Sequence, residues 1–103
     1  MSLEKTERVN QLLDLYESLL TDKQKDVLSL YYRYDYSLSE IANELQVSRT
    51  AIFDIIKRTT KRLEKYESKI QMLKLKEKLW EILPSLSLQD QEKILSILQE
   101  RED

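Results

Sequence analysis

The sequence predicts an all-α fold, and three observations support this prediction. The 103-residue chain contains no glycine and a single proline, Pro84, so residues that break helices are almost absent. Apolar residues recur at spacings of three and four along most of the chain, which is the period of an amphipathic helix. Capping-box patterns at Thr21 and Ser37 mark the starts of two helices.

The N-terminal part is predicted to form two helices. Residues 3–20 place their apolar side chains on one stripe and their charged side chains on the other. Thr21 and Gln24 have the spacing of a capping box, which starts a second helix over residues 22–33. Residues 34–36 are predicted to form a connector.

Two short helices follow with a tight turn between them. Ser37 caps the first, Ser48 caps the second near Arg49, and only Gln46 and Val47 separate the two. This is the arrangement of a helix-turn-helix motif. The apolar residues spaced to hold the pair together are Ile41, Leu45, Val47, Ile52 and Ile55.

Two positions near the turn have special requirements. A helix-turn-helix needs a small residue where its helices approach closely, and Ala42 has that place. The turn often contains glycine, because the backbone there tends to a left-handed φ. Gln46 stands at this point, and a left-handed conformation would cost it about 1 kcal/mol.

The helix that begins near Arg49 has no obvious stop before Pro84. Its apolar period continues to Leu83, so we expect either one long extension or a break around residues 65–69. Ser87 is predicted to cap a last helix.

Part of this long helix could pair with another helix. Its apolar residues fit a short coiled-coil seam that is interrupted at Glu77. We therefore divide the chain into a helix-turn-helix domain with its N-terminal helix, residues 1–65, and a C-terminal helical extension, residues 66–103. The extension is predicted to make the protein a homodimer.

Charge is distributed unevenly along the chain. The net charge is −2, but residues 49–78 contain ten basic and four acidic residues, a local net charge of +6. A basic segment of this kind is typical of phosphate binding, although a solvated face with ion pairs would also explain it.

Several classes of site are excluded or unsupported. The chain has neither cysteine nor histidine, so thiolate and imidazole chemistry are absent, and we see no paired catalytic carboxylates. No apolar run approaches the ~18 residues of a membrane span, and the N-terminus lacks a signal-peptide core. We expect a cytoplasmic protein that is not an enzyme and has no metal or cofactor.

The exposed start of the second motif helix is the predicted reading surface. Arg49, Thr50, Phe53 and Asp54 point outward at the positions that would meet base edges in a major groove. Phe53 could contact a thymine methyl, and Asp54 could accept a hydrogen bond from cytosine.

Basic residues continue along the same helix. Lys57, Arg58 and Lys61 are predicted to contact phosphates. The alternative is that some of them form ion pairs with Asp54 or Glu64 along the helix.

Four tyrosines precede the motif, at positions 31, 32, 34 and 36. RNA-binding proteins use aromatic rings to stack bases. Packing in the core with the hydroxyls at the surface is the more common role, and we favour it here.

Residues 20–63 resemble region 4 of bacterial sigma-70 factors. The matching positions include Leu20, Gln24 and Val27-Leu28 in the leading helix, Ser37 with Glu40–Ala42, and Val47–Ile52. The resemblance implies a DNA-binding helix-turn-helix bundle.

The chain is still more similar to the YlxM family, small bacterial proteins associated with the signal recognition particle operon. The motifs that carry this resemblance are LLTDKQ (19–24), YYRYDYSLSEIA (31–42), VSRTAI (47–52) and DIIKRTTKRLEKYE (54–67). Membership implies a sigma-like DNA-binding domain, a role in transcription regulation and a part in the signal recognition particle pathway.

Two functions stay open from the sequence. In the first, the protein binds nucleic acid, and the geometry favours DNA over RNA such as that of the signal recognition particle. In the second, the motif is a scaffold and the C-terminal helices bind another protein chain.

Overall fold

The computed structural model describes the backbone of residues 2–102 and the side chains of residues 2–100. Within that range the secondary-structure elements are all helical and there is no strand, which confirms the all-α prediction. It divides into two compact units, residues 1–73 and 74–103. The division therefore lies after the boundary between residues 65 and 66 that the sequence suggested. The first residue of the first predicted domain, Met1, and the last residue of the second, Asp103, lie outside the described range.

The first unit begins with α1 (Leu3–Tyr16), capped by Ser2. The predicted helix continued to residue 20, but its last part, η1 (Glu17–Leu19), is a 3₁₀ turn. Such tightening is usual at a helix end, where backbone carbonyls lack partners within the helix.

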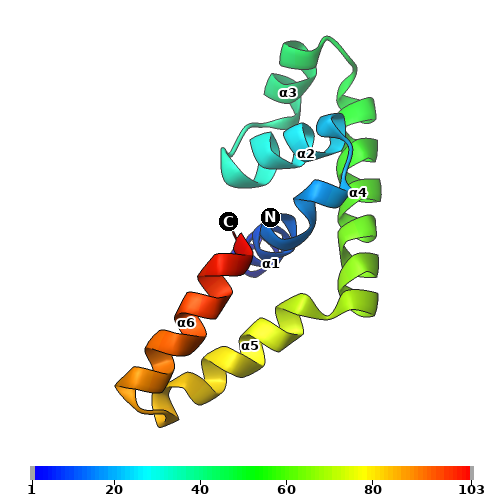
Figure 1. Ribbon diagram of the computed structural model, residues 1–103. Coiled ribbons are helices and arrows are strands. Elements are labelled where there is room, and N and C mark those ends of the chain that lie inside the picture. The colour runs from blue at the N-terminus through cyan, green and yellow to red at the C-terminus, as the bar shows by residue number, and fades with distance from the viewer. Residues whose placement is uncertain (1, 103) are drawn as a thin grey trace. The chain divides into compact units, whose positions relative to one another are not determined.

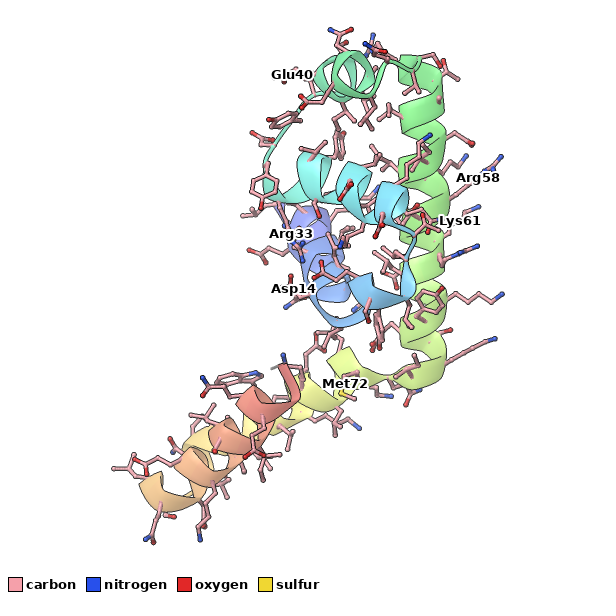
Figure 2. The ribbon with its side chains drawn as sticks, turned by 45° about the horizontal axis from the view of Figure 1, so that its top comes forward. Asp14, Arg33, Glu40, Arg58, Lys61 and Met72 are labelled. Carbon is pink, nitrogen blue, oxygen red and sulfur yellow. The ribbon has the colours of Figure 1, made fainter. Side chains whose placement is uncertain are left out.

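The second predicted helix is present, but it changes from an α-helix to a π-helix about halfway along. It consists of α2 (Asp22–Leu28) and a π-helical turn, η2 (Ser29–Arg33). The capping box at Thr21 is formed as predicted. Arg33 fixes the wide turn against the N-terminal helix, because it pairs with Asp14 at 2.6 Å and with Glu17 at 2.8 Å. Figure 2 labels Arg33 and Asp14 at this contact.

The helix-turn-helix motif is formed by α3 (Leu38–Leu45) and α4 (Arg49–Ile70). Ser37 and Glu40 complete their capping box, and hydrogen bonds from Ser37, chiefly from its backbone N–H, lower the pKa of Glu40. Gln46 ends α3 with φ 56° and ψ 45°, so the turn has the left-handed conformation expected where glycine is common. The left-handed conformation costs Gln46 about 1 kcal/mol, and the turn sets the direction in which α4 follows α3.

One core holds the first unit together. Helices α1, α2 and α3 each contact α4, which runs along the whole unit (Figure 1). The fully buried side chains with the largest volumes come from all four helices; they are Leu12, Leu13, Leu28, Ile41, Ile52 and Leu63. Burial of one such leucine or isoleucine is worth about 1.5–3 kcal/mol, so this shared core fixes how α4 is presented.

A buried carboxylate marks the end of α4. The carboxylate of Glu67, 7% exposed, accepts hydrogen bonds from the Tyr16 hydroxyl at 2.6 Å and from the Leu73 backbone N–H at 2.9 Å. Gln71 is left-handed, with φ 58°, and stops the helix just beyond the window of residues 65–69. The 3.6-residue period continues through this break, so periodicity alone could not locate it.

The second unit contains most of α5 (Met72–Ile82), the 3₁₀ turn η3 (Leu83–Ser85) and α6 (Leu88–Glu102). Pro84 lies in the turn, and the Ser87 hydroxyl accepts a hydrogen bond from the Asp90 N–H as the predicted cap. Among residues 74–100, Leu83 is the one buried side chain. Trp80 is 54% exposed.

Candidate nucleic-acid interface

The first two turns of α4 present a free face because their inner side is fixed in the core. Ser48 caps the helix by accepting a hydrogen bond from the Ala51 N–H at 3.0 Å. Ile52 and Ile56 are buried. With the helix held in this way, Arg49, Thr50 and Phe53 are exposed, as the sequence predicted for base-reading positions. Phe53 is 55% exposed, so its ring is available to a ligand.

A line of cations continues from this face. Lys57 and Lys61 follow Phe53 at successive four-residue steps, so all three lie on one side of the helix. Figure 2 shows Lys61 on the outer side of α4. Both lysines are exposed, and the ion pairs found among residues 2–100 do not involve them. Their charges are therefore open to a ligand.

Asp54 and Arg58 form an ion pair with each other. The Arg58 Nε lies 3.1 Å from an Asp54 carboxylate oxygen, four residues earlier on the helix. The pairing that the sequence left as an alternative is therefore formed for this arginine. The pair is worth only about 0.3–0.5 kcal/mol, because the Arg58 side chain is 79% exposed, so the arginine can exchange Asp54 for a phosphate.

The other pairing considered from sequence is not formed. Glu64 does not hold a lysine of its own helix but binds Arg8 of α1, with two hydrogen bonds of 3.0 Å each. This bidentate contact holds α1 against α4. Because Glu64 is paired with Arg8, it is not the ion-pair partner of Lys61.

Lys5 is a residue of this surface that sequence reasoning missed. It belongs to α1, yet it lines two adjacent hollows, one together with Lys57 and the other together with Lys61. Its position depends on how α1 packs against α4. Neither the spacing of apolar residues nor the distribution of charge along the sequence indicates that packing. The cationic surface is therefore wider than one helix.

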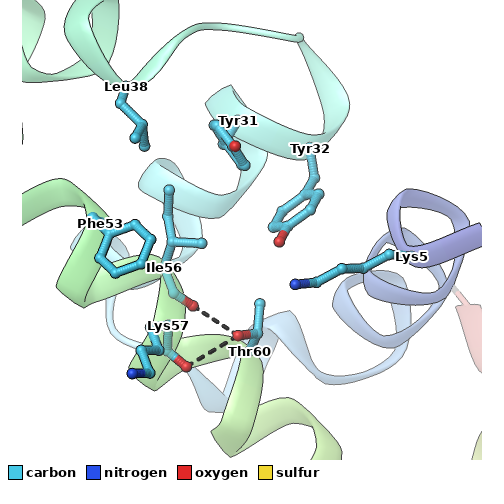
Figure 3. A pocket seen from close by; sticks show the side chains of 8 residues that line it. All are labelled: Lys5, Tyr31, Tyr32, Leu38, Phe53, Ile56, Lys57 and Thr60. Atoms are coloured by element: carbon cyan, nitrogen blue, oxygen red, sulfur yellow. Dashed lines mark hydrogen bonds between the residues drawn. The ribbon is translucent and has the colours of Figure 1, made fainter. Parts of the chain in front are cut away.

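The hollow shared by Lys5 and Lys57 is named here the aromatic pocket. It has a volume of about 280 Å³ and lies between α1, η2 and α4 (Figure 3). Its apolar wall is formed by Tyr31, Tyr32, Leu38, Phe53 and Ile56. Its polar part consists of Lys5, Lys57 and Thr60.

The two tyrosines of this pocket pack in the core, the role favoured from sequence, and also line the pocket. Tyr31 and Tyr32 meet edge to face, with ring centroids 5.0 Å apart. Tyr32 is 6% exposed, and this burial raises the pKa of its hydroxyl. Tyr31 is half-buried. The rings thus belong to the core and also line an open pocket.

The chemistry available on this surface is that of binding. It offers ammonium and guanidinium groups, a hydroxyl and aromatic rings, which come from α1, η2 and α4. The first turn of α4 carries no acidic residue, so the positive end of its helix dipole is not neutralised there. Among the described residues, no group of three or more metal-binding side chains is found. No helix in the described range has the length and apolar character needed to cross a membrane.

Comparison with known proteins identifies the family. Residues 3–101 match the model of family UPF0122, described as "Putative helix-turn-helix protein, YlxM / p13 like". A UPF0122 protein of Bacillus velezensis is 48% identical over 104 residues, covering 96% of this chain and 94% of that protein. YlxM of Bacillus subtilis is 61% identical over 74 residues, covering 72% and 67% respectively. The chain therefore belongs to the UPF0122 family of YlxM-like helix-turn-helix proteins.

Proposed function

We propose that this protein is a cytoplasmic DNA-binding regulator that places the start of α4 in the major groove, and that it is not an enzyme. The observation that carries the proposal is the exposed face of α4, where Arg49, Thr50 and Phe53 lead into Lys57 and Lys61. In this mode Arg49 and Phe53 contact base edges, while the lysines contact phosphates on the groove wall.

The local charge supports nucleic acid as the ligand despite the net charge of −2. Residues 49–70, which form α4, contain seven basic and three acidic residues, and Lys57 and Lys61 lie on the same side of the helix as Phe53. A polyanion is attracted by this local field rather than by the charge of the whole chain.

The test is the affinity for a fluorescent random-sequence duplex, measured by anisotropy between about 50 and 300 mM salt. We expect log K to fall linearly with log salt, with a slope near −2 or steeper, because Lys57 and Lys61 each displace about one counterion. A flat salt response would contradict phosphate binding by this surface.

Part of the proposal extends to the cellular role. The YlxM resemblance supports a place in the signal recognition particle pathway, with transcription regulation as the molecular activity. Repeating the salt titration with the RNA of that particle compares the two ligands; affinity for the RNA well above that for the duplex would reverse our preference for DNA.

A second candidate function is pairing of the C-terminal unit with a second copy of the chain. The observation that favours it is a set of large apolar side chains that the unit leaves at least 40% exposed: Leu75, Trp80, Ile82, Leu88, Leu95 and Ile97. A second copy of the chain would bury part of this exposed apolar area. Sedimentation velocity is expected to give the mass of a dimer, and a monomer at all concentrations would exclude this role.

A further inference from the structure

The aromatic pocket has the composition of a site for a flat ring. Tyr31 and Phe53 come from different elements, and each presents an incompletely buried ring to the same space (Figure 3). At about 280 Å³ the pocket is at the small end of ligand sites, so it has room for one ring system rather than several. Flat ligands gain about 1–3 kcal/mol from stacking on such rings.

The charges at the pocket indicate that its ligand carries negative charge beside the ring. Lys5 and Lys57 approach from α1 and α4, and no carboxylate lines the space. The adjacent hollow adds Lys61, beside the ion pair of Arg8 with Glu64. A nucleobase joined to phosphates on both sides matches a ring site placed between two ammonium groups.

The pocket is also continuous with the face assigned to DNA. Phe53 and Lys57 belong to both, since they line the pocket and are exposed on α4. A nucleic acid lying on α4 therefore brings its bases to the mouth of the pocket without moving the helix.

We propose that the aromatic pocket binds a single unstacked nucleobase, with its flanking phosphates on Lys5 and Lys57. The proposal rests on nucleic-acid binding by α4 and adds a preference for strands that contain an unpaired nucleotide. A paired base must be extruded at a cost of a few kcal/mol, whereas a bulged base has already lost its pairing.

The test compares two DNA duplexes that differ by one bulged 2-aminopurine, whose fluorescence reports stacking. We expect the wild-type protein to bind the bulged duplex about 5- to 50-fold more tightly than the paired one, and to quench the probe. Lys5→Ala and Phe53→Leu should bring the affinity ratio close to 1, because the first removes a phosphate contact and the second removes the ring but keeps an apolar side chain. Lys23→Ala, at an exposed lysine of α2, is the matched control and should keep the ratio.

The outcomes of this test distinguish base binding in the aromatic pocket from duplex binding by α4. Equal affinity of the wild-type protein for both duplexes would overturn the base pocket and leave duplex binding intact. Binding of the bulged duplex alone would support the pocket and count against major-groove reading, and binding of neither would overturn both. The same pair of strands made as RNA shows whether the unpaired base is taken from DNA or RNA.

Discussion

Reversal of the charge on Lys57 and Lys61 together is expected to weaken duplex binding by about 10- to 100-fold near 0.1 M salt. Both side chains are exposed and free of the ion pairs seen among residues 2–100. Lys57→Glu/Lys61→Glu removes the two proposed phosphate contacts and adds repulsion at the same places. Anisotropy should also show a salt slope that is shallower by about 2.

A matched control separates a local effect from a change in net charge. Lys23→Glu/Lys93→Glu changes the net charge by the same amount, at exposed lysines of α2 and α6. We expect this pair to lower the affinity by less than about threefold, since these positions are outside the proposed interface. Equal losses in both double variants would mean that α4 is not the binding surface.

The second large effect concerns stability. Tyr16→Phe is expected to lower the free energy of unfolding by about 1–3 kcal/mol, and Glu67→Ala by about 2–4 kcal/mol. The first change removes a donor to the buried Glu67 carboxylate, and the second leaves both the Tyr16 hydroxyl and the Leu73 N–H without that acceptor. Urea unfolding of both variants and of the double variant gives the coupling energy, expected at about 0.5–3 kcal/mol.

The pH dependence of unfolding provides a check on this contact. Burial, followed by the hydrogen bond to Glu67, raises the pKa of Tyr16 above its ordinary value of 10.0. As the pH rises past 10.0, the Tyr16 hydroxyl therefore loses its proton in the unfolded chain before it does so in the folded chain. The free energy of unfolding then falls. The fall should be smaller in Tyr16→Phe, while Tyr34→Phe, at a tyrosine that is 66% exposed, should behave like the wild type. Additive losses and an unchanged alkaline profile would contradict the coupling.

The sequence predicted most of the first unit because its signals are local. Thr21, Ser37 and Ser48 cap the helices that they were expected to cap, since a cap depends on residues at most three positions away. The exposure of Arg49 and Phe53 followed from the period of the buried isoleucines on α4.

What the sequence did not predict depends on contacts between distant residues. The π-helical turn depends on Arg33 reaching Asp14 in α1, and the end of α4 coincides with Glu67 binding Tyr16. Lys5 joins the interface only because α1 packs beside α4. The sequence also left open which of Lys57, Arg58 and Lys61 would pair with Asp54 or Glu64. Spacing allowed several pairs, and the structure contains the one between Arg58 and Asp54.

The proposed function requires that the outward face of the first half of α4 contacts DNA. The most direct test is an NMR titration of the isotope-labelled chain with a short duplex, in which amide shifts are followed residue by residue. We expect the perturbed amides to concentrate at residues 48–61 and around Lys5. Shifts confined to residues 74–100, or no shifts at a duplex concentration that saturates binding in the anisotropy assay, would contradict the proposed function.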